Sequence, residues 1–404
     1  MNLINEKNQI KIGQLFVLGS ILGVITSPPL ANIFIALTLI WTLSFQLTRS
    51  NLASFFSSKT GYIFLTFLAI IVASPLYGVA PQSEIISSIW GWRKLLMFPL
   101  AAIYFSNKSA GKSFLIQVFF MCCLILAGAS FLKIILLGGD GILIRNYVTQ
   151  GLVLSVGSLI GLLKIVESPS IKWKLIYFSS LVLLVSNIAL ISTGRSGYAA
   201  LLVMLSLCLA LHPKISVTKK LLTVTLIISL VCTIFFSIPN SKNRIKLAYT
   251  EAIAAKNEAQ DTSVGVRIMF WKNTLNMARN SSILGVGTGG FETAYRAEVR
   301  DKSGIEALIT GDPHNQYLKI LIEQGILGLF IFLTLLTFLV INNAKKDIFD
   351  IIGICTLIAW CITSLANAHF STFNEGQFIW IWMGIFLTSQ STSVKTNANN
   401  LNTA

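Results

Sequence analysis

The chain has 404 residues, of which 54% are hydrophobic and only 12% are charged. Soluble domains carry about 25% charged residues, so this composition excludes an ordinary soluble protein and indicates an integral membrane protein. The net charge of +15 would favour nucleic-acid binding in a soluble protein, but here the lysines are dispersed between apolar segments, where they orient a protein in a membrane. We therefore expect membrane lipid as a partner and no nucleic acid.

Apolar runs of the length needed to cross a bilayer, about 17–25 residues, recur from end to end. Backbone groups in lipid must be satisfied within their own segment, so the spans should be helices and the fold class an all-α integral membrane protein. The first run lacks a small-residue cleavage site, so we interpret it as a retained span and not as a secretory signal. We expect about twelve transmembrane helices, near 11–29, 30–48, 60–77, 94–106, 113–136, 150–166, 173–191, 196–212, 219–238, 316–341, 349–366 and 376–390.

The charges between these runs predict the orientation. With both termini in the cytoplasm, the inner connections are rich in lysine, whereas the short outer connections hold only Arg93, Lys94, Lys133, Arg145 and Arg195. This asymmetry is what the positive-inside rule expects, and it places the long polar segment at about 239–312 outside. The expected divisions are a bundle of about nine spans at 1–238, a periplasmic subdomain at 239–312, further transmembrane helices at 313–390 and a cytoplasmic tail at 391–404.

Arginine prevails over lysine in the outer loops that flank the spans. Its rigid fork of donors suits phosphate, whereas the lysine ammonium is a point charge. Arg145 and Arg195 each lie at the edge of a span, where an unpaired charge is costly and suggests a function. The alternative is that both side chains only reach the membrane interface.

The long outer segment is expected to contain short amphipathic helices. Between residues 264 and 279, apolar side chains recur at helical spacing, at Ile268, Trp271, Leu275 and Ala278. We expect this helix to lie on the membrane or to cap the bundle, with Arg267 at its start.

Gly285, Gly287 and Gly290 then match the spacing of a dinucleotide-binding loop. No βαβ unit surrounds them, so we interpret them as a tight turn that allows close backbone approach.

The segment 310–319 returns the chain to apolar sequence. Asp312 can cap the following helix and Pro313 suits its first position, which would place His314 in the first turn. An anion is favoured at such a helix end and an imidazole tends to stay neutral there, so the pattern suggests a reacting lipid phosphate. The alternative is a capped helix start with a hydrogen-bonded histidine. Deeper in this helix, Glu323 could pair with Lys319.

Little in the sequence favours a metal or another cofactor. No D-x-D occurs, and the six cysteines lie in apolar runs without a C-x-x-C pair, so we expect no metal site, no disulfide framework and no cofactor. Arginines can neutralise a diphosphate leaving group instead. Of the other histidines, His212 falls on the inner side, and His369 lies in a short outer loop with Asn367 and Glu375.

Several motifs together resemble the O-antigen ligase/polymerase superfamily. They comprise a span that ends in Ser192-Thr-Gly-Arg-Ser-Gly197, a long outer loop with Val266-Arg267-x-x-x-Trp271, Gly285-Val-Gly287 and Phe291, and then Pro313-His-Asn-Gln-Tyr-Leu318 and Glu323-x-Gly325-Ile-Leu-Gly328. The resemblance covers the C-terminal half of the chain, and the N-terminal half only by the number of spans.

This resemblance implies a metal-independent glycosyltransferase of the bacterial inner membrane with its active site facing the periplasm. The donor would be a glycan on undecaprenyl diphosphate and the acceptor, for a ligase, lipid A–core oligosaccharide. Arg195 and Arg267 match arginines assigned to the diphosphate, and His314 matches the histidine at the reaction centre. We place Arg145, Asp312 and Asn315 among the substrate-binding residues.

Two alternatives stay open. A polymerase of the same superfamily would carry the same motifs. A transporter of lipid-linked glycans would need charged residues through the membrane midplane, and the expected spans have almost none.

Overall fold

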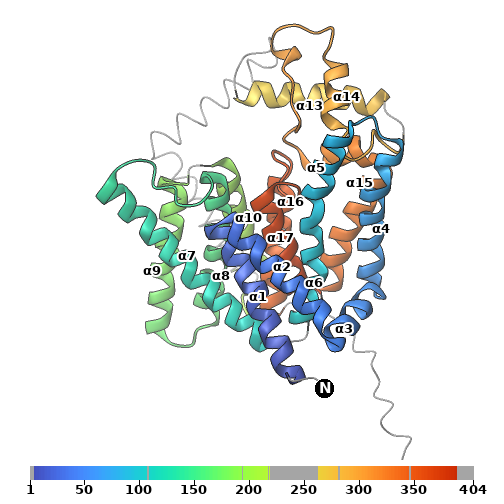
Figure 1. Ribbon diagram of the computed structural model, residues 1–404. Coiled ribbons are helices and arrows are strands. Elements are labelled where there is room, and N and C mark those ends of the chain that lie inside the picture. Colours follow the sequence, from blue (N-terminus) through green and yellow to red (C-terminus); the bar gives the residue numbers. More distant parts are fainter. Residues whose placement is uncertain are drawn as a thin grey trace, which may run out of the picture.

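The structure is a computed structural model that describes residues 4–106, 109–192, 194–216, 218, 263–280, 283–344 and 347–388. Every regular element in these ranges is a helix, which confirms the expected all-α class (Figure 1). The elements are α1 (Glu6–Thr26), α2 (Pro28–Ser44), α3 (Gln46–Phe56), α4 (Lys59–Ala73), η1 (Ser74–Tyr77), α5 (Gln82–Trp92), η2 (Arg93–Leu96), α6 (Met97–Phe105), α7 (Ser109–Leu137), α8 (Tyr147–Glu167), α9 (Ile171–Leu190), α10 (Arg195–Leu211), α13 (Ser263–Asn280), α14 (Phe291–Glu298), η3 (Gly304–Ala307), α15 (Gln316–Asn342), α16 (Ile348–Thr363) and α17 (Phe373–Phe386).

The expected number of about twelve spans is not confirmed. Among the described residues, six helices are long and apolar enough to cross a membrane, namely α1, α4 with η1, α7, α8, α9 and α15. Helices α2 and α3 meet at a bend of 100° and would make a seventh if they form one broken span, whereas α10 and α16 are shorter apolar helices. The span expected near 219–238 lies outside the described residues. The runs expected at 94–106 and 376–390 form the short helices α6 and α17, because apolar sequence can also fill a protein core.

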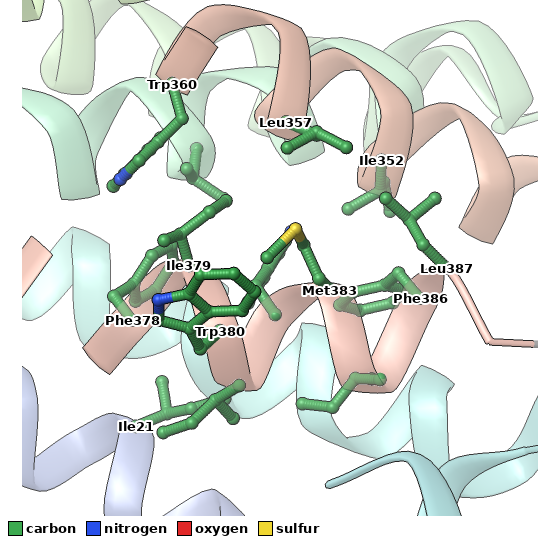
Figure 2. Close-up of a cluster of buried hydrophobic side chains, with 14 of the residues drawn as sticks. Ile21, Ile352, Leu357, Trp360, Phe378, Ile379, Trp380, Met383, Phe386 and Leu387 are labelled. Carbon is green, nitrogen blue, oxygen red and sulfur yellow. The ribbon is translucent and has the colours of Figure 1, made fainter. Parts of the chain in front are cut away.

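Helix α17 forms the centre of the bundle. All of its residues from 374 to 386 are buried, and it packs against α1, α6 and α16. Figure 2 shows Trp380 and Met383 of α17 between Ile21 of α1 and Leu357 of α16. A helix that is apolar on nearly every side is stable in a protein core or in lipid, and α17 is in the core because other helices cover it.

Helix α15 is interrupted where the glycine-rich turn contacts it. Gly325 has φ 69° and ψ −173°, which are not helical values. The break leaves two carbonyl groups available, and the turn uses them: the Val286 N–H donates to the Ile322 oxygen at 2.8 Å and the Gly287 N–H to the Glu323 oxygen at 2.9 Å. Irregular backbone inside a membrane protein is tolerated where other protein groups satisfy it in this way.

The turn requires glycine for two reasons: its backbone has positive φ values, and it leaves no room for a Cβ atom. Gly285 and Gly287 have φ values of 80° and 85°, which side chains rarely adopt. A Cβ atom on Gly285 would lie 2.5 Å from the backbone nitrogen of Gly325. The close backbone approach expected from the sequence is therefore confirmed.

Helix α13 is confirmed at Ser263–Asn280, but its buried face differs from the prediction. Phe270 and Met277 are buried against α14, whereas Leu275 is 47% exposed. The apolar spacing fits either face of this helix, and the contact with α14 decides which face is covered.

Helices α13 and α14 lie over one end of the helical bundle (Figure 1). The loops that join α9 to α10 and α16 to α17 reach the same end, where Asn367 donates to the Ser196 hydroxyl at 2.9 Å. The start of α15 joins them, because the Gln316 N–H donates to the Ser364 oxygen at 3.0 Å. We call this the site end of the molecule.

Candidate active site

Helix α15 starts later than the sequence predicted. Its N-cap is Asn315, whose side-chain oxygen accepts from the N–H groups of Tyr317 at 3.0 Å and Leu318 at 3.1 Å. The predictions that Asp312 caps this helix and that His314 lies in its first turn are therefore wrong. The carboxylate of Asp312 instead accepts from the His314 N–H at 2.8 Å and closes a turn ahead of the helix. The side-chain oxygen of Asn315 is thus occupied as the helix cap. A substrate-binding role for Asn315 stays a prediction.

His314 has an unusual backbone conformation at the centre of this turn. Its φ is 52°, and it is the one residue other than glycine with a positive φ among those that the structure describes. Such a conformation costs about 1–3 kcal/mol and persists where the surrounding structure imposes it, often at functional sites. The imidazole lies against Phe270 of α13, with 6.1 Å between ring centroids and 23° between ring planes.

The surroundings of His314 favour its neutral form. Burial lowers the pKa of the imidazole, and the charges of Arg267 and Lys319 lower it further, whereas Asp312 acts in the opposite direction. The net direction is downward from 6.5. The neutral imidazole expected from the sequence is thus supported, although burial and two cations replace the helix dipole as the cause.

Arg195 and Arg267 come together from distant parts of the chain. Arg195 is the first residue of α10, and Arg267 lies near the start of α13. Burial lowers the pKa of Arg267, and the charge of Arg195 lowers it further, while Tyr147 and Asp312 raise it. Neither guanidinium has an ion pair among the described residues. Two like charges held together in this way favour an anion between them.

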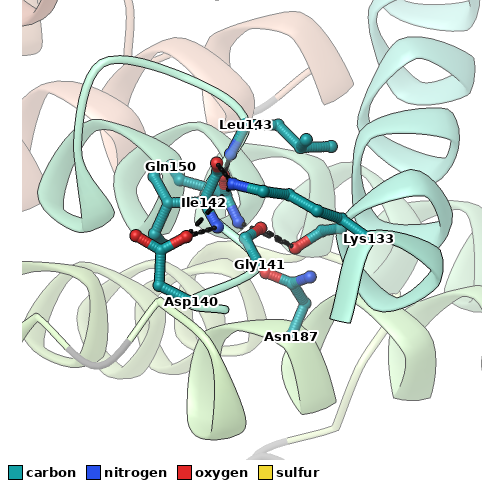
Figure 3. A network of polar contacts seen from close by, with 8 residues as sticks. Lys133, Asp140, Gly141, Ile142, Leu143, Gln150 and Asn187 are labelled. Atoms are coloured by element: carbon teal, nitrogen blue, oxygen red, sulfur yellow. Dashed lines mark hydrogen bonds and ion pairs between the residues drawn. The ribbon is translucent and has the colours of Figure 1, made fainter. Parts of the chain in front are cut away.

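The loop that carries Arg145 is braced by a polar network (Figure 3). The Lys133 ammonium donates to Asp140 at 3.2 Å, and the side-chain oxygen of Gln150 accepts from the Leu143 N–H at 2.9 Å. Arg145 is exposed, and its charge acts on Lys94. The structure therefore brings Arg145 to the site end, within electrostatic range of Lys94.

Sequence reasoning did not select two buried residues of this end, Lys94 and His369. The Lys94 ammonium donates to the carbonyl oxygens of Ser371 and, at 2.8 Å, of Thr372. The sequence signal for Lys94 was its place next to Arg93 between two apolar segments, where a charge is costly.

His369 is 2% exposed, and neither ring nitrogen has a hydrogen-bond partner among the described residues. Burial lowers its pKa to about 4, against the opposing charges of Glu375 and Asp312. The signal for His369 was its position two residues after Asn367 in the outer loop.

Two other expectations can be compared with the structure. Lys319 and Glu323 do not form the ion pair suggested by their spacing; Glu323 instead accepts from the side chain of Gln324 at 3.3 Å. Among the described residues, no group of three His, Cys, Asp or Glu side chains is placed to hold a metal ion.

Fold and site together define a multi-pass helical membrane protein with a cationic, histidine-containing site at one end. The family model described as O-antigen ligase matches residues 179–333, a stretch that contains Arg195, Arg267, Asp312 and His314. This match covers the part of the chain that carries these residues and supports a relationship to the O-antigen ligase superfamily.

A curated relative is similar to part of this chain, but its description names no function. An uncharacterized protein of Haemophilus influenzae is 24% identical over 215 residues, which cover 50% of this chain and 53% of that protein. The chain thus matches about half the length of this relative.

Proposed function

We propose that this protein is a glycosyltransferase of the bacterial inner membrane that moves a glycan from undecaprenyl diphosphate to lipid A–core oligosaccharide on the periplasmic face. The match of residues 179–333 to the O-antigen ligase family supports a ligase- or polymerase-type reaction with lipid-linked glycan substrates. One observation carries the proposal: helix α13, which bears Arg267, packs Phe270 against His314 with 6.1 Å between ring centroids, and Arg195 and Asp312 lie close enough to Arg267 for their charges to act on it.

The arginine pair would hold the donor diphosphate. Arg195 and Arg267 have no carboxylate pair among the described residues, so their donors are available to phosphate oxygens. Charge-assisted, bidentate hydrogen bonds of this kind strengthen as negative charge builds on a leaving group. The two guanidinium groups would thus favour breakage of the bond between the anomeric carbon and the diphosphate oxygen.

His314 would act on the acceptor. As an acceptor hydroxyl attacks the anomeric carbon, it must lose its proton, and the neutral imidazole can take that proton. The products are the new glycosidic bond, protonated His314 and the lipid diphosphate. Attack opposite the leaving group in a single displacement inverts the anomeric centre.

Reconstitution of the full chain with a lipid-linked glycan and candidate acceptors tests this proposal. We expect a single glycan addition to lipid A–core in EDTA, since the proposed clamp consists of arginines and not of a metal ion. Growth of the lipid-linked glycan into a ladder would favour the polymerase instead. Loss of transfer in EDTA, restored by magnesium or manganese, would reject the arginine clamp.

A further inference from the structure

A second group of cations lies at the site end. Lys319, in the first turn of α15, is within electrostatic range of both His314 and Lys94. The charges of Arg93 and Arg145 also act on Lys94, and Glu375 acts on Lys94 with opposite sign. We call Lys94, Arg145 and Lys319 the second cation group.

Lys319 occupies a position that disfavours an unpaired positive charge. It is half-buried and has no hydrogen bond or ion pair through its side chain with any residue that the structure describes. The N-terminal end of a helix carries a partial positive charge, so a lysine in its first turn is destabilising. Glu323, one turn further along, does not neutralise Lys319 by an ion pair. An anion from outside the chain would offset this cost.

A buried amide donor without a partner lies at the same helix start. The side-chain oxygen of Gln316 accepts from the N–H groups of Phe370 and Ser371, each at 3.0 Å. Its nitrogen has no partner among the described residues, although Gln316 is fully buried. The carbonyl of Ser371 accepts from Lys94, so Gln316 and the second cation group are joined through one residue. A buried donor of this kind normally has a partner, because leaving it unpaired costs about 1–3 kcal/mol.

We propose that Lys319, together with Lys94 and Arg145, forms a second phosphate subsite at the start of α15, near His314. Arg93 adds a fourth cation near Lys94, and the carboxylates that act on this group are Glu375 and Glu323, so an excess of positive charge remains that suits a phosphate group. Lys319 is the residue that would contact the phosphate, whereas Lys94 is held by two carbonyl groups and contributes its charge. The phosphate is either the second phosphate of the donor or one carried by the acceptor. Naming the donor or the acceptor as the carrier of this phosphate rests on the proposed function, whereas the existence of the phosphate subsite does not.

Binding measurements on the purified full chain test the subsite without any transfer reaction. The probes are undecaprenyl diphosphate alone, and inorganic phosphate added to protein already saturated with undecaprenyl diphosphate. Lys319→Gln removes the charge and Lys319→Arg retains it. Lys272→Gln serves as the control, because Lys272 is an exposed lysine that pairs with Glu306 at 3.2 Å, away from this group.

We expect Lys319→Gln to weaken the binding of one of the two probes by about five- to tenfold. Lys319→Arg and Lys272→Gln should bind both probes with affinities close to those of the unaltered protein. Weaker undecaprenyl diphosphate binding assigns the subsite to the donor, and weaker binding of the added phosphate assigns it to a separate phosphate such as that of an acceptor. The ligand-free melting temperature of Lys319→Gln should be unchanged or higher, because an unfavourable charge has been removed.

Unchanged binding of both probes would overturn the subsite. So would a lower ligand-free melting temperature with both probes equally weakened, since that result assigns Lys319 to folding. Failure of glycan transfer with normal phosphate binding would instead reject the proposed function and leave the subsite intact.

Discussion

At the scale of single residues, His314 carries the reaction in the proposed mechanism. We expect His314→Ala to bind the lipid-linked donor but to transfer on the order of 10²–10⁴-fold more slowly, the usual size of a general-base contribution. His314→Asn is the matched variant, because asparagine tolerates a positive φ and keeps the turn. Donor binding and single-turnover transfer are measured on the same preparation. Lost binding with normal turnover of the bound donor would make His314 a donor ligand.

The arginine pair allows a test of geometry at constant charge. Arg195→Lys and Arg267→Lys keep the positive charge but lose the bidentate fork, so each should impair transfer strongly while expression and membrane insertion stay normal. Arg279→Lys, on the exposed last turn of α13, is the control. Transfer near the unaltered rate in both site variants would return these arginines to a role at the membrane interface.

His369 predicts how stability depends on pH. Its pKa is about 4 in the folded protein, against an ordinary value of 6.5, so the unfolded chain binds the proton more readily. Stability should therefore fall as the pH decreases from about 6.5 towards 4, by on the order of 3 kcal/mol at the lower end. His369→Gln should lose less stability over this range in thermal unfolding. Equal losses in both proteins would mean that His369 does not titrate there.

At the scale of elements, the break in α15 depends on glycine. A Cβ atom on Gly325 would lie 2.1 Å from the carbonyl oxygen of Ile283, and the φ of 69° with ψ of −173° is a region reserved for glycine. Gly325→Ala should therefore destabilise the protein by more than about 2 kcal/mol. Gly128→Ala, in α7 with no atom within 4 Å of the added group, should be neutral or slightly stabilising. Thermal unfolding of both variants decides between these outcomes.

The same break explains how a loop supports the site. The glycine-rich turn completes the backbone hydrogen bonds that α15 lacks, while the turn and Ile322 of α15 join the apolar contacts around α13 and α14. Helix α13 in turn carries Arg267 and places Phe270 against His314. A substitution of Gly325 should therefore also disturb the active site, because it alters the support of α13, although Gly325 itself makes no catalytic contact.

At the scale of the whole molecule, the orientation in the membrane remains a prediction from the charges between spans. Ser303 lies between α14 and η3, and Ser57 lies between α3 and α4. Figure 1 shows α14 at the site end and α3 towards the opposite end. Ser303→Cys should react with an impermeant thiol reagent in intact spheroplasts, and Ser57→Cys only after permeabilisation. The unaltered protein, whose six cysteines lie in apolar runs, measures the background. The reverse pattern would place the site in the cytoplasm and reject a periplasmic reaction.

Composition and pattern determined the all-helical membrane class of this protein and predicted the residues of its candidate site. Long apolar runs allow only a helical membrane fold, because lipid offers no hydrogen bonds to the backbone. Arg195, Arg267, Asp312 and His314 were selected from sequence, and the structure places them close together. Such residues can be selected from sequence because a charge next to an apolar run is energetically costly, so its presence there suggests a function.

The tertiary structure decided which groups satisfy one another. Asn315 caps α15 because Asp312 closes the preceding turn, a choice between two good capping residues that local sequence leaves open. The buried face of α13 follows from α14. Lys94 became visible through its hydrogen bonds to Ser371 and Thr372, and His369 through its burial without a hydrogen-bond partner among the described residues. Local sequence determines which conformations and charges are available, whereas burial and pairing between distant segments determine their energies.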